Sequence, residues 1–243
     1  MTINNMPVQN REKLAQPPVP APWQLMGDGY VVAVWMPNLK NTIEQSEHTL
    51  ARKAINKASR LWSQGRVQLL IFAHYTQSDV GPYDELLHIP QLSHGVVEGY
   101  PSIDRIYVSS MASVINGQQN WGIPKELALF DYQPATGLQA KSITVTMPDQ
   151  QPIARIELQA SRFKFPVNTA LIPARLRTLV QDWRGKRFYT APEASGRACF
   201  ASVKHWWFDP VYFPDLSGGK VLAAFKMTDF KMTFPLAKIT RLD

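Results

Sequence analysis

The sequence is poor in cysteine and in long hydrophobic runs. Its 243 residues include one cysteine, Cys199, so no disulfide forms within the chain, and this scarcity is typical of reducing compartments. No apolar run approaches the ~18 residues of a membrane-spanning helix. Residues 1–6 have neither a basic start nor a long apolar stretch, which argues against a signal peptide. We therefore expect a cytoplasmic protein with no membrane partner.

Several motifs of enzymes and cofactor-binding proteins are also absent. There is no Gly-X-Ser-X-Gly elbow of a serine hydrolase, and Ser-Gly-Gly-Lys at 217–220 is typical of a hairpin turn rather than of a phosphate loop. The histidines lack metal-ligand spacing, and His88 with His94 near Glu98 is a weak candidate for a metal site. We expect neither a metal nor an organic cofactor.

The charge balance is basic, with a formal net charge of +7. This charge would suit a nucleic-acid-binding or basic interaction domain, but the lysines and arginines are scattered and no RNA-recognition motif or zinc-finger spacing occurs. We expect no nucleic-acid partner. A milder use of the same charge is the attraction of anionic substrates.

The hydrophobic pattern predicts two regions. Residues 1–22 are polar and then proline-rich, which indicates an extended arm, and residues 23–243 are expected to form a single domain. One long amphipathic helix is expected over 41–64, because apolar residues recur every three to four positions between a capping residue, Asn41, and a terminating glycine, Gly65. A second short helix is expected over 173–182.

Most other segments have the composition of strands. An apolar run at 30–36 precedes Pro37, and Asp-Gln-Gln-Pro at 149–152 is a natural hairpin connection. Further runs rich in Val, Ile, Tyr, Phe and Thr predict strands at 66–75, 80–91, 103–109, 127–132, 138–147, 153–161, 197–205 and 220–234. Many strands with few helices indicate a mainly β, α+β fold, either a barrel or a sandwich.

One segment has the pattern of a reactive lysine. Residues 119–128, Gln-Asn-Trp-Gly-Ile-Pro-Lys-Glu-Leu-Ala, place Lys125 directly after a Gly-X-Pro turn. Apolar side chains flank it: Trp121, Ile123 and Leu127. Burial disfavours the charged form of a lysine, and a neutral amine attacks carbonyl groups to form a Schiff base. The alternative is an ordinary surface lysine after a turn.

This segment resembles the catalytic lysine segment of the acetoacetate decarboxylase family. Residues 80–87, Val-Gly-Pro-Tyr-Asp-Glu-Leu-Leu, resemble the family's Gly-X-Tyr-X-Glu strand, whose glutamate faces the same pocket. Residues 22–30 resemble the start of the first barrel strand. The elements keep their order from about Pro20 to the C-terminus, so the chain is identified as a divergent, decarboxylase-like member of the family.

The resemblance implies a closed or partly closed antiparallel barrel with the 41–64 helix outside it, and a homo-oligomer. It implies an apolar pocket inside the barrel, with Lys125 and Glu85 as catalytic residues. The supporting residues of this pocket would be Tyr83, Trp121, Ile123, Pro124 and Glu126.

The sequence also departs from the family pattern. Glu126 stands where the family has a second lysine, and a carboxylate there would raise the pKa of Lys125 unless strand alternation turns it away. The family's first-strand arginine falls near Asp28, and its other pocket glutamate falls within 67–72, which contains no acid. An arginine fork matches the two oxygens of a carboxylate, so its loss argues against acetoacetate itself. Another arginine, such as Arg105 or Arg197, is a candidate replacement.

The function expected from these features is that of a Schiff-base lyase. Its substrate would be a small carbonyl compound or β-keto acid, and its reaction a decarboxylation or an aldol or dehydration step. The alternative is a non-catalytic relative in which the barrel binds a small molecule and Lys125 is a structural partner of a glutamate. The sequence names neither the substrate nor the pathway.

Overall fold

The structure is a computed structural model that describes part of the chain. The expected helix over 41–64 and residues 1–16 of the expected arm are outside the described residues. The described residues are 17–37, 65–92, 99–133 and 140–242.

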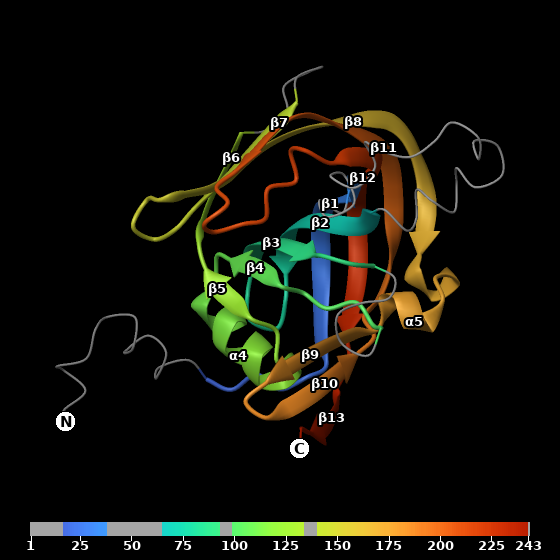
Figure 1. Ribbon diagram of the computed structural model, residues 1–243. Helices are drawn as coiled ribbons and strands as arrows, with labels where there is room; N and C mark the ends of the chain where they lie inside the picture. Colours follow the sequence, from blue (N-terminus) through green and yellow to red (C-terminus); the bar gives the residue numbers. More distant parts are fainter. Residues whose placement is uncertain (1–16, 38–64, 93–98, 134–139, 243) are drawn as a thin grey trace, which may run out of the picture.

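Ten strands form one curved sheet (Figure 1). They are β1 (Trp23–Pro37), β2 (Gly65–Gln77), β3 (Tyr83–Ile89), β4 (Arg105–Val108), β5 (Lys125–Leu127), β6 (Leu129–Gln133), β7 (Lys141–Thr146), β8 (Pro152–Asn168), β11 (Glu193–Phe208) and β12 (Lys220–Phe234). Their order is β5-β4-β3-β2-β1-β12-β11-β8-β7-β6. Neighbours are antiparallel except β4 and β5, which are parallel. The two edge strands, β5 and β6, are separated in the chain by Ala128 alone, so the sheet curls into a nearly closed barrel. The expected mainly β barrel is confirmed.

The long strands follow from the composition of their sequences. β1 is rich in Val, Tyr and Trp, and its buried and less buried positions alternate along most of its length. The hairpin expected at 149–152 joins β7 to β8, which pair in antiparallel register from Lys141 opposite Leu158. The single run expected at 127–132 is divided at Ala128 between β5 and β6.

A smaller sheet covers one end of the molecule. It consists of β9 (Leu179–Trp183), β10 (Lys186–Thr190) and β13 (Lys238–Arg241). The helix expected over 173–182 is therefore wrong for most of its length, because α5 (Ala174–Arg177) has four residues and β9 follows it. The hairpin from β9 to β10 turns at Arg184 and Gly185, whose φ angles of 49° and 70° suit a two-residue turn of the primed type.

An eleven-residue helix, α4 (Met111–Trp121), packs against the sheet. The sequence pattern did not predict this helix. The Ser110 side chain accepts a hydrogen bond from the backbone of Ser113 at its start. Gly122 ends it in the left-handed conformation, with φ of 65°. Residues 17–22 lie along this helix, where the Val19 backbone N–H donates to the Asn116 side chain at 2.7 Å.

Two hydrophobic cores lie on opposite faces of β2 and β3. Side chains alternate along a strand, so Leu86 belongs to the larger core and Leu87 to the smaller. The larger core lies between β1–β3 and β7–β8 of the curved sheet, and the smaller core lies between β1–β4 and α4. In the smaller core the rings of Trp23 and Trp121 meet edge to face, with centroids 4.8 Å apart. Of the expected pocket residues, Tyr83, Trp121 and Ile123 belong to the smaller core.

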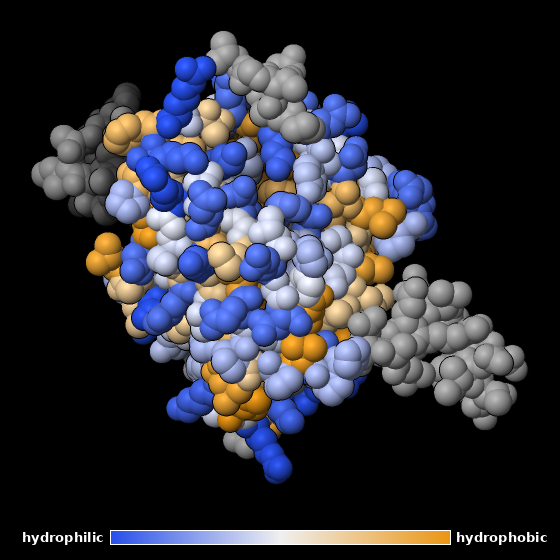
Figure 2. All heavy atoms as spheres, turned by 180° about the vertical axis from the view of Figure 1, so that it is seen from behind, coloured by the Kyte–Doolittle hydropathy of each residue, from blue (hydrophilic) through white to orange (hydrophobic). Residues whose placement is uncertain are grey.

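The exterior is mostly polar. Hydrophilic side chains cover much of the rear of the molecule, and hydrophobic ones are exposed in separate patches (Figure 2). Within the described part of the chain, no helix has the length and apolar character needed to cross a membrane.

Close packing between β1 and β2 predicts that Gly27 does not accept a side chain. A Cβ at this position would overlap the backbone carbonyl oxygen of His74, which cannot move without disturbing β2. We expect Gly27→Ala to lower the free energy of unfolding by about 1–3 kcal/mol, measured by urea denaturation. Gly218→Ala is the matched control, because nothing lies within 4 Å of its added Cβ. Equal stability of the two variants would contradict this packing.

Candidate active site

Lys125 is held by the end of a helix, a turn and the start of a strand. Gly122 ends α4, Pro124 constrains the backbone, and Lys125 begins β5 opposite Ile106 of β4. The Gln118 side chain of α4 donates a hydrogen bond to the Lys125 carbonyl at 2.9 Å. The backbone of the lysine is therefore fixed from two directions, and its side chain enters a buried space.

The Lys125 ammonium contacts three oxygen atoms. Its Nζ lies 2.8 Å from Glu85 Oε2, 2.9 Å from Ser113 Oγ and 3.4 Å from the Tyr83 hydroxyl. The Lys125 side chain is 5% exposed and that of Glu85 is 7% exposed, so solvent hardly screens this ion pair. An ammonium has three N–H donors, and the three oxygens match them.

The Glu85 carboxylate has a second partner on the neighbouring strand. The Tyr75 hydroxyl of β2 donates to Glu85 Oε1 at 3.1 Å, so each carboxylate oxygen accepts a hydrogen bond. Burial raises the pKa of Tyr83 to about 12, and burial and Glu85 raise the pKa of Tyr75 well above its ordinary value. Both phenols therefore keep their protons near neutral pH and remain hydrogen-bond donors.

The protonation of Lys125 differs from the sequence expectation. Burial alone lowers the pKa of this lysine, as expected, but the charges of Glu85 and Tyr83 and the hydrogen bonds to them raise it. The pKa is raised overall, because the ion-paired carboxylate favours the ammonium. In the resting state Lys125 is therefore a charged ammonium, and it donates one of its N–H protons to Glu85 in a hydrogen bond.

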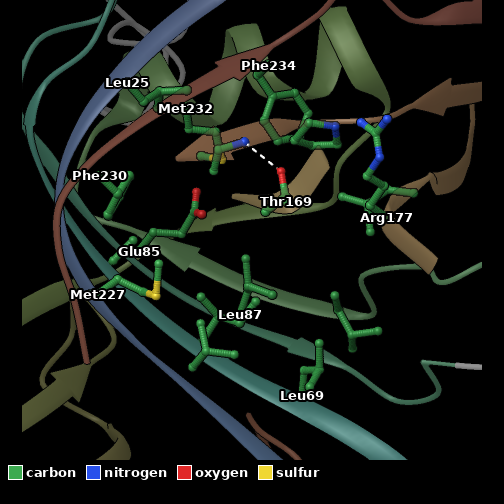
Figure 3. A pocket seen from close by; sticks show the side chains of 18 of the residues that line it. Leu25, Leu69, Glu85, Leu87, Thr169, Arg177, Met227, Phe230, Met232 and Phe234 are labelled. Atoms are coloured by element: carbon green, nitrogen blue, oxygen red, sulfur yellow. Dashed lines mark hydrogen bonds between the residues drawn. The ribbon is translucent and has the colours of Figure 1, made fainter. Parts of the chain in front are cut away.

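These groups lie at the wall of one large pocket (Figure 3). Its volume is about 670 Å³, within the range of pockets that hold drug-sized ligands. Most lining side chains are apolar and come from the face of the smaller core, including Leu69, Leu87 and Phe234. Three charged residues line it within the described part of the chain: Glu85, Lys125 and Arg177.

Three of the five supporting residues expected from the sequence line this pocket, namely Tyr83, Trp121 and Ile123. Pro124 is half-buried and does not line it. Glu126 is exposed and does not line it either, which corrects the expectation that it supports the site. Successive strand residues point to opposite faces, so the carboxylate next to Lys125 in sequence is turned away from the ammonium.

Other acids and arginines considered in the sequence also lie elsewhere. Asp28 does not line the pocket, and its side chain accepts a hydrogen bond from the backbone of Asp229 at 2.9 Å. Arg105 and Arg197 are exposed and do not line the pocket. The arginine that lines the pocket is Arg177, which belongs to none of the motifs described in the sequence analysis.

Two further groups at the site were missed. Ser113 comes from α4, and Tyr75 from β2. Ser110 and Gly122, the two capping residues of α4, were the signal that would have located this helix and its inward-facing serine. Tyr75 lies in an expected strand, but its contact with Glu85 depends on the pairing of β2 with β3.

The other titratable clusters have structural partners. His88, which was considered as a metal ligand, is buried between Asp104 and Gln68, at 2.7 Å and 2.8 Å from its ring nitrogens. His94 and Glu98 are outside the described residues. Among the residues that the structure describes, no three His, Cys, Asp or Glu side chains come together as a metal-binding group.

Comparison with known proteins identifies the fold. No model of a known protein family and no curated protein matches the sequence. An acetoacetate decarboxylase from Legionella pneumophila matches the structure with a TM-score of 0.60 and 11% identity, over 99% of this chain and 98% of that one. An acetoacetate decarboxylase-like enzyme from Sphingomonas wittichii RW1 gives a TM-score of 0.55 and 14% identity, over 93% and 94% of the two chains.

A third similar structure is the enduracididine biosynthesis enzyme MppR in complex with pyruvate. It matches with a TM-score of 0.55 and 13% identity, over 91% of each chain. All three likenesses extend over nearly the full chain, so this protein has the fold of acetoacetate decarboxylase and related enzymes. At these identities the likeness establishes the fold, and the chemistry must be argued from the site.

The Lys125–Glu85 pair predicts how the lysine titrates. In Glu85→Gln the carboxylate is gone while burial remains, so the pKa of Lys125 should fall below its ordinary value of about 10.5. NMR of lysines labelled at Cε measures this pKa directly. Asp84→Asn is the matched control, because the neighbouring Asp84 side chain pairs with His74 instead.

The same pair predicts a pH dependence of stability. A lysine whose folded pKa is raised contributes stability that is fully present below its unfolded pKa and is lost as pH rises through the folded pKa. The difference in unfolding free energy between wild type and Glu85→Gln should therefore be largest below about pH 10 and should shrink above it. A Lys125 pKa that is unchanged in Glu85→Gln would contradict the assignment of the ion pair.

Proposed function

We propose that this protein is a lyase that forms a Schiff base between Lys125 and the carbonyl group of its substrate. The observation that carries the proposal is a buried lysine, ion-paired with a buried glutamate, at the wall of an apolar pocket in a fold shared with acetoacetate decarboxylase. A lysine away from water and beside a proton acceptor has the surroundings that imine chemistry requires.

The first step is a proton transfer within the ion pair. The ammonium has no lone pair and cannot attack a carbonyl carbon. Glu85 Oε2, 2.8 Å from Nζ, accepts the proton and leaves a neutral amine. The amine adds to the carbonyl carbon, and one proton passes from the nitrogen to the new alkoxide oxygen to give a carbinolamine. The protonated Glu85 then donates to this hydroxyl, which leaves as water, and the protonated imine remains. Ser113 and Tyr83 hold the nitrogen in place during these transfers.

The protonated imine then acts as an electron sink. In a β-keto acid, the bond to the carboxylate breaks, carbon dioxide leaves and its electrons form an enamine on Lys125. In an aldol or dehydration reaction, a proton leaves the carbon next to the imine and the same enamine forms. The similar structures include a decarboxylase and an enzyme solved with pyruvate, which is consistent with either course. The enamine carbon then takes up a proton or bonds to a second carbonyl carbon, which restores the imine, and hydrolysis of the imine releases the product.

One observation favours the alternative, a non-catalytic binding protein. The raised pKa of Lys125 means that the resting site holds an ammonium whose three donors are all engaged. A purely structural ion pair has the same appearance. The two functions differ in whether a carbonyl compound entering the pocket acquires a covalent bond to Nζ.

Borohydride trapping tests the proposal. The protein is incubated with a panel of ketones and β-keto acids, reduced, and analysed by peptide mass spectrometry. We expect a reduced adduct on the peptide that contains Lys125 at pH values from about 6 to 9, and none there in Lys125→Ala. Folded protein without an adduct at any pH in this range would contradict the lyase proposal and favour the binding-protein alternative.

Gly117 provides a second test that leaves Lys125 and Glu85 unchanged. A Cβ on Gly117, in α4, would lie 2.8 Å from Cδ and 3.0 Å from Cε of Lys125, so the lysine side chain must shift. We expect Gly117→Ala to reduce trapping on Lys125 by about tenfold, since a displacement of about 1 Å has large effects on positioned groups. Its unfolding free energy should change by less than about 1 kcal/mol, because alanine favours helix and offsets the crowding.

Gln119→Ala is the matched control for this variant. Gln119 is exposed on the same helix, so the substitution adds alanine to α4 without approaching the lysine. Undiminished trapping in Gly117→Ala would mean that the position of Nζ in the structure is not the reactive one.

A further inference from the structure

Arg177 brings a further positive charge to the pocket. It lies at the end of α5, and its side chain is 20% exposed. The described charged residues that line the pocket are Lys125, Glu85 and Arg177, so their charges sum to one positive charge. The ion pair at Lys125 is internally neutral, and Arg177 therefore sets the sign of the electrostatic field in the pocket.

The guanidinium of Arg177 is incompletely paired. Nη1 donates to Glu193 Oε1 at 3.0 Å, but the Glu193 side chain is 64% exposed, and an ion pair at such a site is weak and readily exchanged. Nε is buried and has no hydrogen-bond partner among the described residues. A buried N–H without an acceptor is costly and uncommon in folded proteins, so this group has donor capacity that an anionic ligand would satisfy.

The two charged parts of the pocket lie apart in a lining that is mostly apolar. Arg177 and Glu85 lie at different sides of the cavity, Thr169 is drawn between them, and Leu87 and Leu69 line the space on one side (Figure 3). A ligand that reaches both parts needs an electrophilic carbon at Lys125, an apolar body, and an anionic group at Arg177. A planar guanidinium fork matches the two oxygens of a carboxylate, with which it forms paired hydrogen bonds.

We propose that the substrate is an oxo acid in which an apolar chain or ring separates the reacting carbonyl from a carboxylate that binds Arg177. This inference rests on the proposed function and adds the substrate class. The carboxylate at Arg177 is a recognition group and remains on the product, because it is distant from the carbon bonded to Nζ. Any carboxylate lost in the reaction is a second one, attached to the carbon adjacent to the imine carbon.

The test compares acids with their amides in borohydride trapping on the full chain. The probes are levulinate and its longer unbranched methyl-ketone homologues, each paired with its terminal primary amide. For the longer homologues we expect half-maximal trapping at about tenfold lower concentration for the acid than for the amide, the effect of one charge-assisted hydrogen-bonded pair. The preference should be weaker for levulinate, which is too short to span the apolar surface.

Arg177→Gln should abolish the preference for acids, so that acid and amide of the same length reach half-maximal trapping at similar concentrations. Arg177→Lys keeps the charge without the fork and should retain part of the preference. Arg175→Gln is the matched control: it removes the same charge from an exposed position of α5 that does not line the pocket, and it should behave as wild type.

The outcomes separate this inference from the proposed function. Equal trapping of acid and amide by wild type, or an acid preference that survives in Arg177→Gln, overturns the role of Arg177 while the lyase proposal stands. If no ketone forms an adduct, the lyase proposal fails, and calorimetric binding of the same probes to Lys125→Met decides the role of Arg177. If Lys125→Met binds acids better than amides and loses this preference when Arg177→Gln is added, the role of Arg177 is supported. If Lys125→Met shows no preference, the role of Arg177 is overturned.

Discussion

The ion pair between Lys125 and Glu85 is the interaction on which the rest of the site depends. The side chains of Lys125 and Glu85 are 5% and 7% exposed, so both charges are removed from water. This removal costs free energy, which their mutual attraction and further hydrogen bonds offset. Ser113, Tyr83 and Tyr75 supply those bonds. The segments around the pair are correspondingly constrained: β3 carries the acid, β5 the lysine, and α4 the serine and the glutamine that holds the lysine backbone.

The sequence predicted the centre of the site better than its surroundings, and the reason is local. Lys125 and Glu85 lie in short motifs whose residues are adjacent in the chain, so a single sequence displays them. Ser113 and Arg177 come from segments with no motif, and only the folded chain brings them to the pocket. The spacing of residues in one sequence carries no information about which distant segments the fold brings together.

The errors about elements have similar causes. The stretch over 173–182 looked helical, but Val180 is fully buried in β9, paired with Tyr189 in β10, so tertiary packing overrode a weak local preference. The sequence pattern did not predict α4, because its apolar residues are few and Gly117 interrupts it, although Ser110 and Gly122 mark both of its ends. Gly117 weakens the helix and makes room for the lysine side chain, so the residue that obscured the helix in the sequence is one the site requires.

A large apolar pocket around a charged lysine reconciles the resting state with imine chemistry. The ion pair is already largely removed from water, so its mutual attraction and its hydrogen bonds keep both groups charged. Under the proposed function, a substrate that fills the pocket removes the little solvent contact that remains, and this penalises two charges more than a neutral amine beside a neutral acid. Because Nζ and Oε2 are 2.8 Å apart, the change requires only the movement of one proton along an existing hydrogen bond. Under the proposed function, a substrate that fills the pocket therefore favours the neutral amine, although the resting pKa of Lys125 is raised.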